Sequence, residues 1–259
     1  MQRLTTLLFD VDGTLAETEE IHREAFNTAF ERAGLDWHWS AETYTELLSV
    51  TGGKERIRYF LDTRLPAFRA PGDLDAFIAA LHADKTGIYT RTVASGGVPM
   101  RPGVRRLLLE AREAGLRLGI ATTTTPANVT ALLRHSLAAD AEEWFEVIAA
   151  GGVVGEKKPA PDIYHYAMHS MGVTAAECLA FEDSENGLRS ARAAGVQTLV
   201  TVSRYTEGQD FSGAALVLDH LGEPDQPFRV LAGDAGDVSC VTIGQLFALH
   251  AGSAVQARA

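Results

Sequence analysis

The sequence predicts an α/β fold, in which a doubly wound parallel sheet forms the core and a helical segment is inserted near the N-terminus. From residue 104 onward, short apolar runs alternate with amphipathic stretches. Strands that alternate with helices of about 10–15 residues are typical of βαβ units and a parallel sheet. Between residues 17 and 94 the apolar residues instead recur at helical spacing.

The N-terminal part of the chain begins with one predicted strand and continues with predicted helices. Residues 4–9, LTTLLF, form an apolar run that ends in Asp and Gly, which predicts a buried strand leading into a turn. In the stretch 16–34 that follows, Ile21, Phe26 and Phe30 lie on one helical stripe that Gly34 closes. Further helical patterns follow at 44–50, 54–65 and 74–93.

After the Gly- and Pro-containing joint 95–103, the pattern changes to alternating elements. The predicted helices are 104–115, 125–137, 161–172, 185–195 and 241–250. The predicted strands are 116–122, 145–151, 177–183, 196–202 and 214–221. Residues 222–237 are rich in Gly, Pro and Asp and predict a loop, and residues 253–259 are expected to fray.

Composition excludes several classes of partner. The 259 residues include 46% hydrophobic and 22% charged residues, as in ordinary globular proteins, and carry a formal net charge of −11. This charge argues against a nucleic-acid or anionic-membrane partner. Cys178 and Cys240 match no metal-binding spacing and make a disulfide framework unexpected. No apolar stretch reaches membrane-spanning or signal-peptide length, so we expect a cytoplasmic protein, without an evident obligate protein partner.

Polar residues stand at equivalent places along the predicted sheet, at or just after the ends of strands. They are Asp10 and Asp12 after the first strand, Thr122 after the second, Lys158 after the third and its loop, and Glu182 with Asp183 at the end of the fourth. Open parallel sheets bind ligands beyond the carboxyl ends of their strands. The sequence therefore predicts that these side chains converge on one crevice.

The residue types in this set suit phosphoryl chemistry. Asp10 and Asp12 lie two residues apart on an extended segment, so both can face one ligand. Their repulsion, increased by Asp183, would be relieved by a hard cation such as Mg²⁺. One carboxylate can attack phosphorus while its neighbour transfers protons. Thr122 offers a hydroxyl and Lys158 a positive charge for the phosphoryl oxygens. For each residue alone, a surface turn, a helix cap or a solvated lysine would be an adequate explanation.

The combination resembles a known family. DVDGTL, the strand ending at Thr122, KKPAPDIY and FEDSENGLRSARAAG resemble, in order, the four motifs of the haloacid-dehalogenase-like (HAD) phosphohydrolases. KPAPDIY and EDSxNGxxxAxxAG are typical of the branch that contains β-phosphoglucomutase and phosphoglycolate phosphatase. The resemblance implies that Asp10 is the nucleophile and Asp12 the acid–base. It also implies Mg²⁺ ligands from the Asp10 carboxylate, the Asp12 carbonyl and Asp183, with Glu182 beside or among them.

The resemblance further implies a mobile cap at residues 17–96 and a catalytic core formed by residues 1–16 and 97–259. Glu17 and His22 lie at the start of this cap and are candidates for substrate contact. In TGGKERI, Gly52 and Gly53 expose backbone N–H groups at a helix start where Lys54 adds positive charge, which predicts an anion site. A Gly-rich turn with a surface lysine is the alternative. The core would contribute Thr122, Thr123 and Lys158 to substrate binding.

Four classes of function use residues of these types. Hydrolysis of a small phosphate ester, including phosphoglycolate, and phosphate transfer within a sugar by a mutase share every motif. A receiver-type phospho-switch is rejected because its acidic pair precedes a separate nucleophile, and a dehalogenase would lack the Asp12 equivalent. The mutases have a motif of the form DGVxxD at the position where this chain has DGTLAET. This difference favours a phosphatase.

Through cap and core, the chain is most similar to CbbY-type phosphatases associated with the Calvin cycle. This resemblance rests on FDVDGTLAETEEIHREAFNTAF, LDWHW, LLSVTGGKERI, MRPGV, ATTTTPANV and EKKPAPDIYHYA. It implies removal of the 1-phosphate of xylulose-1,5-bisphosphate, a small sugar phosphate.

Overall fold

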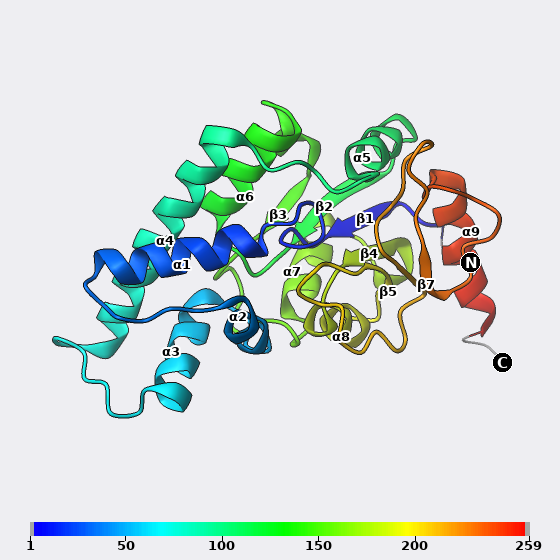
Figure 1. Cartoon of the computed structure of the whole chain (residues 1–259). Coiled ribbons are helices and arrows are strands. Elements are labelled where there is room, and N and C mark those ends of the chain that lie inside the picture. The colour runs from blue at the N-terminus through cyan, green and yellow to red at the C-terminus, as the bar shows by residue number, and fades with distance from the viewer. Residues whose placement is uncertain (1–2, 257–259) are drawn as a thin grey trace.

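The computed structural model describes residues 3–256 and is built on a seven-stranded sheet with helices on both faces (Figure 1). The strand order is β3-β2-β1-β4-β5-β6-β7, in which β1 to β6 pair in parallel and β7 is antiparallel to β6. The strands are β1 Thr6–Phe9, β2 Arg117–Ala121, β3 Val147–Ala149, β4 Cys178–Glu182, β5 Gln197–Thr201, β6 Leu216–Leu218 and β7 Val230–Gly233. The predicted doubly wound α/β class is confirmed.

The helices fall into two groups along the chain. The first group comprises α1 Glu19–Arg32, α2 Ala41–Leu47, α3 Gly53–Arg64 and α4 Leu74–Gly96. The second comprises α5 Val104–Glu113, α6 Pro126–Leu132, α7 Asp162–Met171, α8 Glu185–Ala193 and α9 Ile243–Gln256. A π-helical turn, Leu133–Leu137, continues α6, and short 3₁₀ turns lie at Ala141–Trp144 and Ala175–Glu177.

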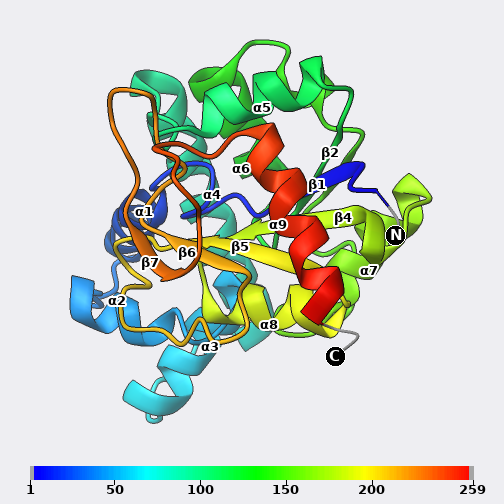
Figure 2. The same cartoon turned by 90° about the vertical axis from the view of Figure 1, so that its right-hand side faces the viewer.

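The central strand β1 is buried on both sides, as expected for a parallel sheet covered by helices. Leu7 and Phe9 face one way and pack in a cluster with apolar residues of α5, α6 and α9, whereas Leu8 faces the other way, toward α7 and α8. This alternation follows from the two-residue period of a strand. Figure 2 shows α9 lying across the first of these faces.

Helices α1 to α4 form a separate group at one side of the sheet (Figure 1). Their aromatic cluster contains Phe26, Phe30, Trp39 and Tyr44, and it also takes in Tyr205 from the loop after β5. The C-terminal half of α4 instead packs with the sheet-side cluster through Ile88, Tyr89 and Val93, beside α6. The predicted division into a core and a cap of residues 17–96 stays a prediction, which this separate cluster supports.

The chain enters and leaves the helical segment 17–96 at adjacent points. Ala16 forms an isolated β-bridge with Met100, and the amide of Arg101 donates to the Leu15 carbonyl at 2.9 Å. The buried Arg101 guanidinium donates to carbonyls on three further segments, among them those of Thr201 (2.9 Å) and Val202 (2.7 Å). One buried cation therefore ties the crossing point to the ends of the sheet.

Two predictions about the C-terminal region need correction. Residues 222–237 were expected to be a loop, but Val230–Gly233 forms the edge strand β7. Its side chains are exposed, so there is no buried apolar pattern from which a strand could be predicted. Helix α9 continues to Gln256, beyond the expected end at residue 250. Residues 257–259 of the segment expected to fray lie outside the described residues.

No helix within residues 3–256 is long and apolar enough to cross a membrane. The cytoplasmic location expected from the sequence stays a prediction.

Candidate active site

Three carboxylates meet at the carboxyl ends of the central strands. Asp10 follows β1, and Glu182 and Asp183 stand at the end of β4, which pairs directly with β1. Each offers an oxygen within 4.8 Å of the others, and all three side chains are buried. The structure thus brings together the acidic residues that the sequence placed on separate strands.

Lys158 is the cation within this cluster. Its Nζ donates to Asp10 Oδ1 at 2.7 Å and to Glu182 Oε1 at 2.6 Å, and Glu182 Oε1 also accepts the hydroxyl of Tyr164. Burial alone would lower the pKa of Lys158, but the charges of Asp10 and Glu182 outweigh burial and raise it. Lys158 therefore stays protonated at neutral pH.

One lysine does not balance three buried carboxylates. Burial raises the pKa of Asp10, although Lys158 and a hydrogen bond from Thr122 oppose the rise. Burial raises the pKa of Glu182 to about 7, and burial together with the Asp10 charge raises that of Asp183. Among the described residues, Glu182 Oε2 has no hydrogen-bond partner. This cluster contains several carboxylate oxygens and too little positive charge to balance them, which fits a divalent cation such as Mg²⁺.

The turn after Asp12 requires glycine for a steric reason. Gly13 has φ +80°, and a Cβ at this position would lie 2.1 Å from Oδ2 of Asp183. A side chain here would strain the backbone and displace a carboxylate of the cluster.

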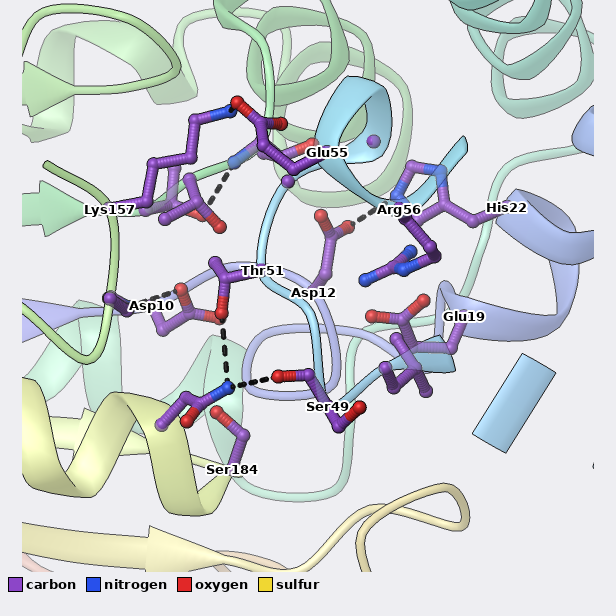
Figure 3. A pocket seen from close by; sticks show the side chains of 18 of the residues that line it. Asp10, Asp12, Glu19, His22, Ser49, Thr51, Glu55, Arg56, Lys157 and Ser184 are labelled. Carbon is purple, nitrogen blue, oxygen red and sulfur yellow. Dashed lines mark hydrogen bonds and ion pairs between the residues drawn. The ribbon is translucent and has the colours of Figure 1, made fainter. Parts of the chain in front are cut away.

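Asp12 faces away from the three carboxylates, toward α1 (Figure 3). Its Oδ1 accepts the Thr18 hydroxyl at 2.6 Å and lies 3.0 Å from Nε2 of His22. Burial raises the pKa of Asp12, but His22, Thr18 and Lys85 together more than reverse this and leave it lowered. The surroundings therefore shift the pKa values of these two aspartates, only two residues apart, in opposite directions.

The threonines after β2 also reach the site. Thr122 is buried, and its amide donates to the Ala149 carbonyl at 2.9 Å, so it extends the pairing of β2 with β3. Thr122 and Thr123 both line the cavity described below. Thr125 then caps α6, since its hydroxyl accepts the Asn128 amide.

A cavity of about 920 Å³ lies between the ends of the strands and helices α1 to α4, and Figure 3 shows it from close by. Ten of the predicted site residues line it: Asp10, Asp12, His22, Gly52, Gly53, Lys54, Thr122, Thr123, Lys158 and Asp183. Glu182 lies beneath the lining, with no exposed surface. A cavity of this size suits a small ligand rather than a macromolecule.

Glu17 is placed differently from the other candidates. Its exposed carboxylate lies 3.2 Å from Nε of Arg101, at the crossing point of the chain, and it is not among the residues lining the cavity. The structure therefore gives no contact through which Glu17 would bind a ligand in this arrangement.

The TGGK segment leads into the first turn of α3 and faces the cavity. Lys54 is exposed there, and within residues 3–256 it forms no ion pair. Gly52 has φ +96°, and a Cβ on it would lie 2.2 Å from Oε2 of Glu55 and 2.5 Å from Nζ of Lys157. A Cβ on Gly53 would lie 2.5 Å from the His82 ring, so close packing explains both glycines. The ammonium of Lys54, which has no ion pair with the described residues, remains available for an anion.

Sequence reasoning missed several residues that line the same cavity, and these are Arg56, His82, Lys85, Lys157 and Asn186. One of these residues, Lys85, could have been identified from the sequence pattern. Lys85 stands on the apolar stripe of α4 with Ile78, Leu81 and Ile88, and it is buried like them. A lysine at a core position of a helix is costly unless it has a partner, so this position pointed to a polar contact inside. The others depend on contacts between distant segments.

A model of the haloacid dehalogenase-like hydrolases matches residues 4–195. The chain therefore belongs to this family, as the motifs predicted.

Several individual relatives that are similar to this chain over most of its length are CbbY proteins. Protein CbbY encoded on a plasmid of Cupriavidus necator is 51% identical over 224 residues, covering 86% of this chain and 88% of the relative. Protein CbbY of Rhodobacter capsulatus is 54% identical over 211 residues, covering 82% and 91%. The crystal structure of a CbbY mutant from Rhodobacter sphaeroides in complex with xylulose-1,5-bisphosphate has 47% identity and a TM-score of 0.79, covering 84% and 94%. The protein is accordingly a phosphatase, a phosphoric monoester hydrolase.

Proposed function

We propose that the protein is a Mg²⁺-dependent phosphatase that converts xylulose-1,5-bisphosphate to xylulose-5-phosphate through an aspartyl-phosphate. The observation that carries the proposal is the placement of Asp10, Lys158 and Asp183 at one wall of a cavity whose opposite wall presents Lys54, which has no ion pair with any described residue. The bound sugar bisphosphate in the CbbY mutant structure, at 47% identity, supports the same substrate class. Such a reaction would remove an inhibitor of Rubisco in the Calvin cycle.

In the first step, an Asp10 carboxylate oxygen would attack phosphorus and the bond to the sugar oxygen would break. Asp12 would donate its proton to that leaving oxygen. The lowered pKa of Asp12 favours the carboxylate in the free enzyme, but a phosphate dianion beside it would raise that pKa and favour the acid.

In the second step, water would attack the phosphorus of the aspartyl-phosphate, and Asp12 would take the proton of the water. Asp10 is released as a carboxylate together with inorganic phosphate, and Asp12 is again protonated. The Thr122 hydroxyl and the Lys158 ammonium would hold phosphoryl oxygens in both steps.

The residues fit a divalent cation, with Asp10, Asp183, the Asp12 carbonyl and Glu182 as the groups that would hold it. When bound, Mg²⁺ would compensate the charge of the carboxylates and of the phosphoryl oxygens.

Substrate recognition would come from the helical segment 17–96 acting as a cap over the core. Lys54, with the backbone of Gly52 and Gly53, would bind the distal phosphate, while His22 would connect the cap to Asp12. A short linear bisphosphate would then bridge core and cap and favour their closed arrangement.

A substrate panel tests this proposal. Purified protein with Mg²⁺ is given xylulose-1,5-bisphosphate, ribulose-1,5-bisphosphate, phosphoglycolate and β-glucose-1-phosphate, and both free phosphate and isomerised sugar phosphate are measured. We expect the highest kcat/KM for xylulose-1,5-bisphosphate, with phosphate release. A preference for phosphoglycolate would contradict the substrate, and isomerisation of the glucose phosphate would contradict hydrolysis.

A further inference from the structure

Asn186 links the acidic cluster to the loop that precedes the TGGK segment. Its Nδ2 donates to the Ser49 carbonyl at 3.1 Å and to the Thr51 hydroxyl at 3.1 Å, and dashed lines in Figure 3 mark both bonds. We propose that Asn186 is a positioning residue, which holds loop 49–53 and hence Lys54 at a set place opposite Asp10. The inference rests on the proposed function only for its kinetic consequences.

The core side of this link is rigid. Asn186 lies in the first turn of α8, which Ser184 caps by accepting the Gly187 amide at 3.1 Å. Gly187 packs directly on Glu182, since a Cβ there would lie 1.8 Å from Oε2 of that carboxylate. Asp183 immediately precedes Ser184 in the chain. The side-chain amide of Asn186 is therefore fixed relative to the carboxylate cluster.

On the other side, the acceptors belong to a short connection that is bonded locally to its flanking helices, since the Ser49 and Val50 amides donate to carbonyls of α2 and the Gly52 carbonyl accepts from α3. Residues 49–52 join α2 to α3, and Gly52 takes up a backbone conformation that other residues rarely adopt. Thr51 is separated from Lys54 by the two glycines alone. A contact that holds Thr51 in place therefore also sets the orientation of the first turn of α3 toward the cavity.

Within the described residues, the other polar contacts between the core and the helical segment, such as those of Asp12 with His22 and of Arg101 with Glu17, involve residues outside loop 49–53. Two further contacts lie elsewhere on the helical segment. Lys157 pairs with Glu55 at 2.7 Å, but a bound phosphate would compete for this lysine. Tyr205 donates to Glu20 on α1, away from the loop. The Asn186 bonds involve only neutral groups. An anionic ligand therefore does not compete for them by charge, as it would for the Lys157 ammonium.

An asparagine suits this position because one NH₂ group can donate to two acceptors. Aspartate has no donor and would face the Ser49 carbonyl with a negative charge, and alanine has no polar atom. Losing the link shifts the protein toward arrangements in which the two walls of the cavity are not aligned. The apparent affinity for a ligand that touches both walls then falls in proportion to the fraction of protein in which the walls are aligned.

The test compares Asn186→Ala and Asn186→Asp with a matched pair, Thr51→Val and Thr51→Ser. Thr51→Ser keeps the hydroxyl acceptor and Thr51→Val removes it. Amide hydrogen exchange of residues 49–54 is measured without ligand, and KM and kcat are measured for xylulose-1,5-bisphosphate and for p-nitrophenyl phosphate, which has no second anion.

In Asn186→Ala we expect exchange of these amides to be about tenfold faster, equivalent to about 1.4 kcal/mol. KM for the bisphosphate should rise by about tenfold with kcat within about twofold, and kcat/KM for p-nitrophenyl phosphate should hardly change. Asn186→Asp should show a larger effect, Thr51→Val a smaller one, and Thr51→Ser should match the parent.

Unchanged exchange in Asn186→Ala would overturn the proposal. So would an equal loss with both substrates, because that result would mean that the carboxylate cluster itself had moved. If the parent does not hydrolyse the bisphosphate, the proposed substrate fails, while the exchange result still decides the role of Asn186.

Discussion

The ammonium of Lys85 lies 2.7 Å from Nδ1 of His22, and both side chains are buried. Since the ammonium has only donors, Nδ1 accepts, and the ring proton sits on Nε2, which lies 3.0 Å from Oδ1 of Asp12. Burial lowers the pKa of Lys85 to about 8, and the Asp12 charge opposes this decrease. A charge on α4 thus controls the tautomer of His22 beside Asp12.

The first prediction concerns this arrangement. Lys85→Met keeps the length of the side chain and removes its charge, so His22 loses the group that sets its tautomer. We expect kcat to fall by about tenfold or more, with the largest loss for poor leaving groups, because proton transfer by Asp12 is affected. The melting temperature should be unchanged or higher, since a desolvated charge has been removed. A lower melting temperature with unchanged kcat would contradict this interpretation.

Asp10→Asn removes the nucleophile and keeps the shape of the side chain. We expect turnover to fall by at least about a thousandfold. The fold should persist, because burial already disfavours the Asp10 charge and Lys158 keeps Glu182 as its partner at 2.6 Å. Steady-state assays and circular dichroism check both points, with mass spectrometry to exclude hydrolysis of the amide. Activity within about tenfold of the parent would mean that Asp10 is not the nucleophile.

Removal of divalent metal should silence the enzyme, and Mg²⁺ should restore it. The carboxylates of Asp10, Glu182 and Asp183 are held within 4.8 Å of one another, so a bound cation should also stabilise the fold. At a Mg²⁺ concentration of one hundred times its dissociation constant, the gain is about 2.7 kcal/mol. Thermal unfolding in EDTA and in Mg²⁺ measures it, and Asp183→Asn should reduce the gain. Full activity in chelator would rule out a metal-dependent reaction.

Lys54→Ala should raise KM for the bisphosphate by about tenfold or more and leave p-nitrophenyl phosphate nearly unaffected. The reason is that Lys54 is exposed in the cavity and forms no ion pair with the described residues, so its charge is free for the distal phosphate. Lys54→Arg, which keeps the charge, should recover part of the affinity. Equal losses with both substrates would indicate a packing defect in α3 instead.

His82 should make the fold sensitive to acid. Burial and the cations Lys85, Lys54 and Lys157 lower its pKa from 6.5 to about 3, with Glu55 opposing them. The unfolded chain therefore binds a proton between pH 6.5 and 3 that the folded chain does not, and stability is lost as pH falls through this window. Between pH 7 and pH 5 the loss from this group is about 2 kcal/mol.

Urea unfolding at both pH values measures this loss. His82→Gln should lose less stability than the parent over the same interval, whereas the exposed His135→Gln should behave like the parent. An unchanged pH dependence in His82→Gln would show that other groups cause the acid sensitivity.

The strands β1 to β6 and the order of the catalytic motifs could be predicted because both depend on local patterns. A short apolar run such as residues 4–9, which ends in Asp and Gly, favours a buried strand, and a parallel sheet must bring its carboxyl ends to one edge. Asp10, Thr122, Lys158 and Asp183 follow from that rule together, without any knowledge of side-chain contacts. The edge strand β7 was missed for the opposite reason, since its exposed residues have no pattern that distinguishes them from a loop.

The sequence by itself therefore determined the fold class and the set of groups at the ends of the strands. Only the tertiary structure decided which distant residues complete the cavity. His82 and Lys85 lie on α4, Asn186 on α8 and Lys157 before α7, and each reaches the cavity because segments distant in the sequence face one another there. Glu17, adjacent to the first motif, turns instead to Arg101. Such pairings depend on contacts between segments far apart in the chain, 137 residues in the case of Asn186 and Ser49, for which a single sequence contains no periodic signal.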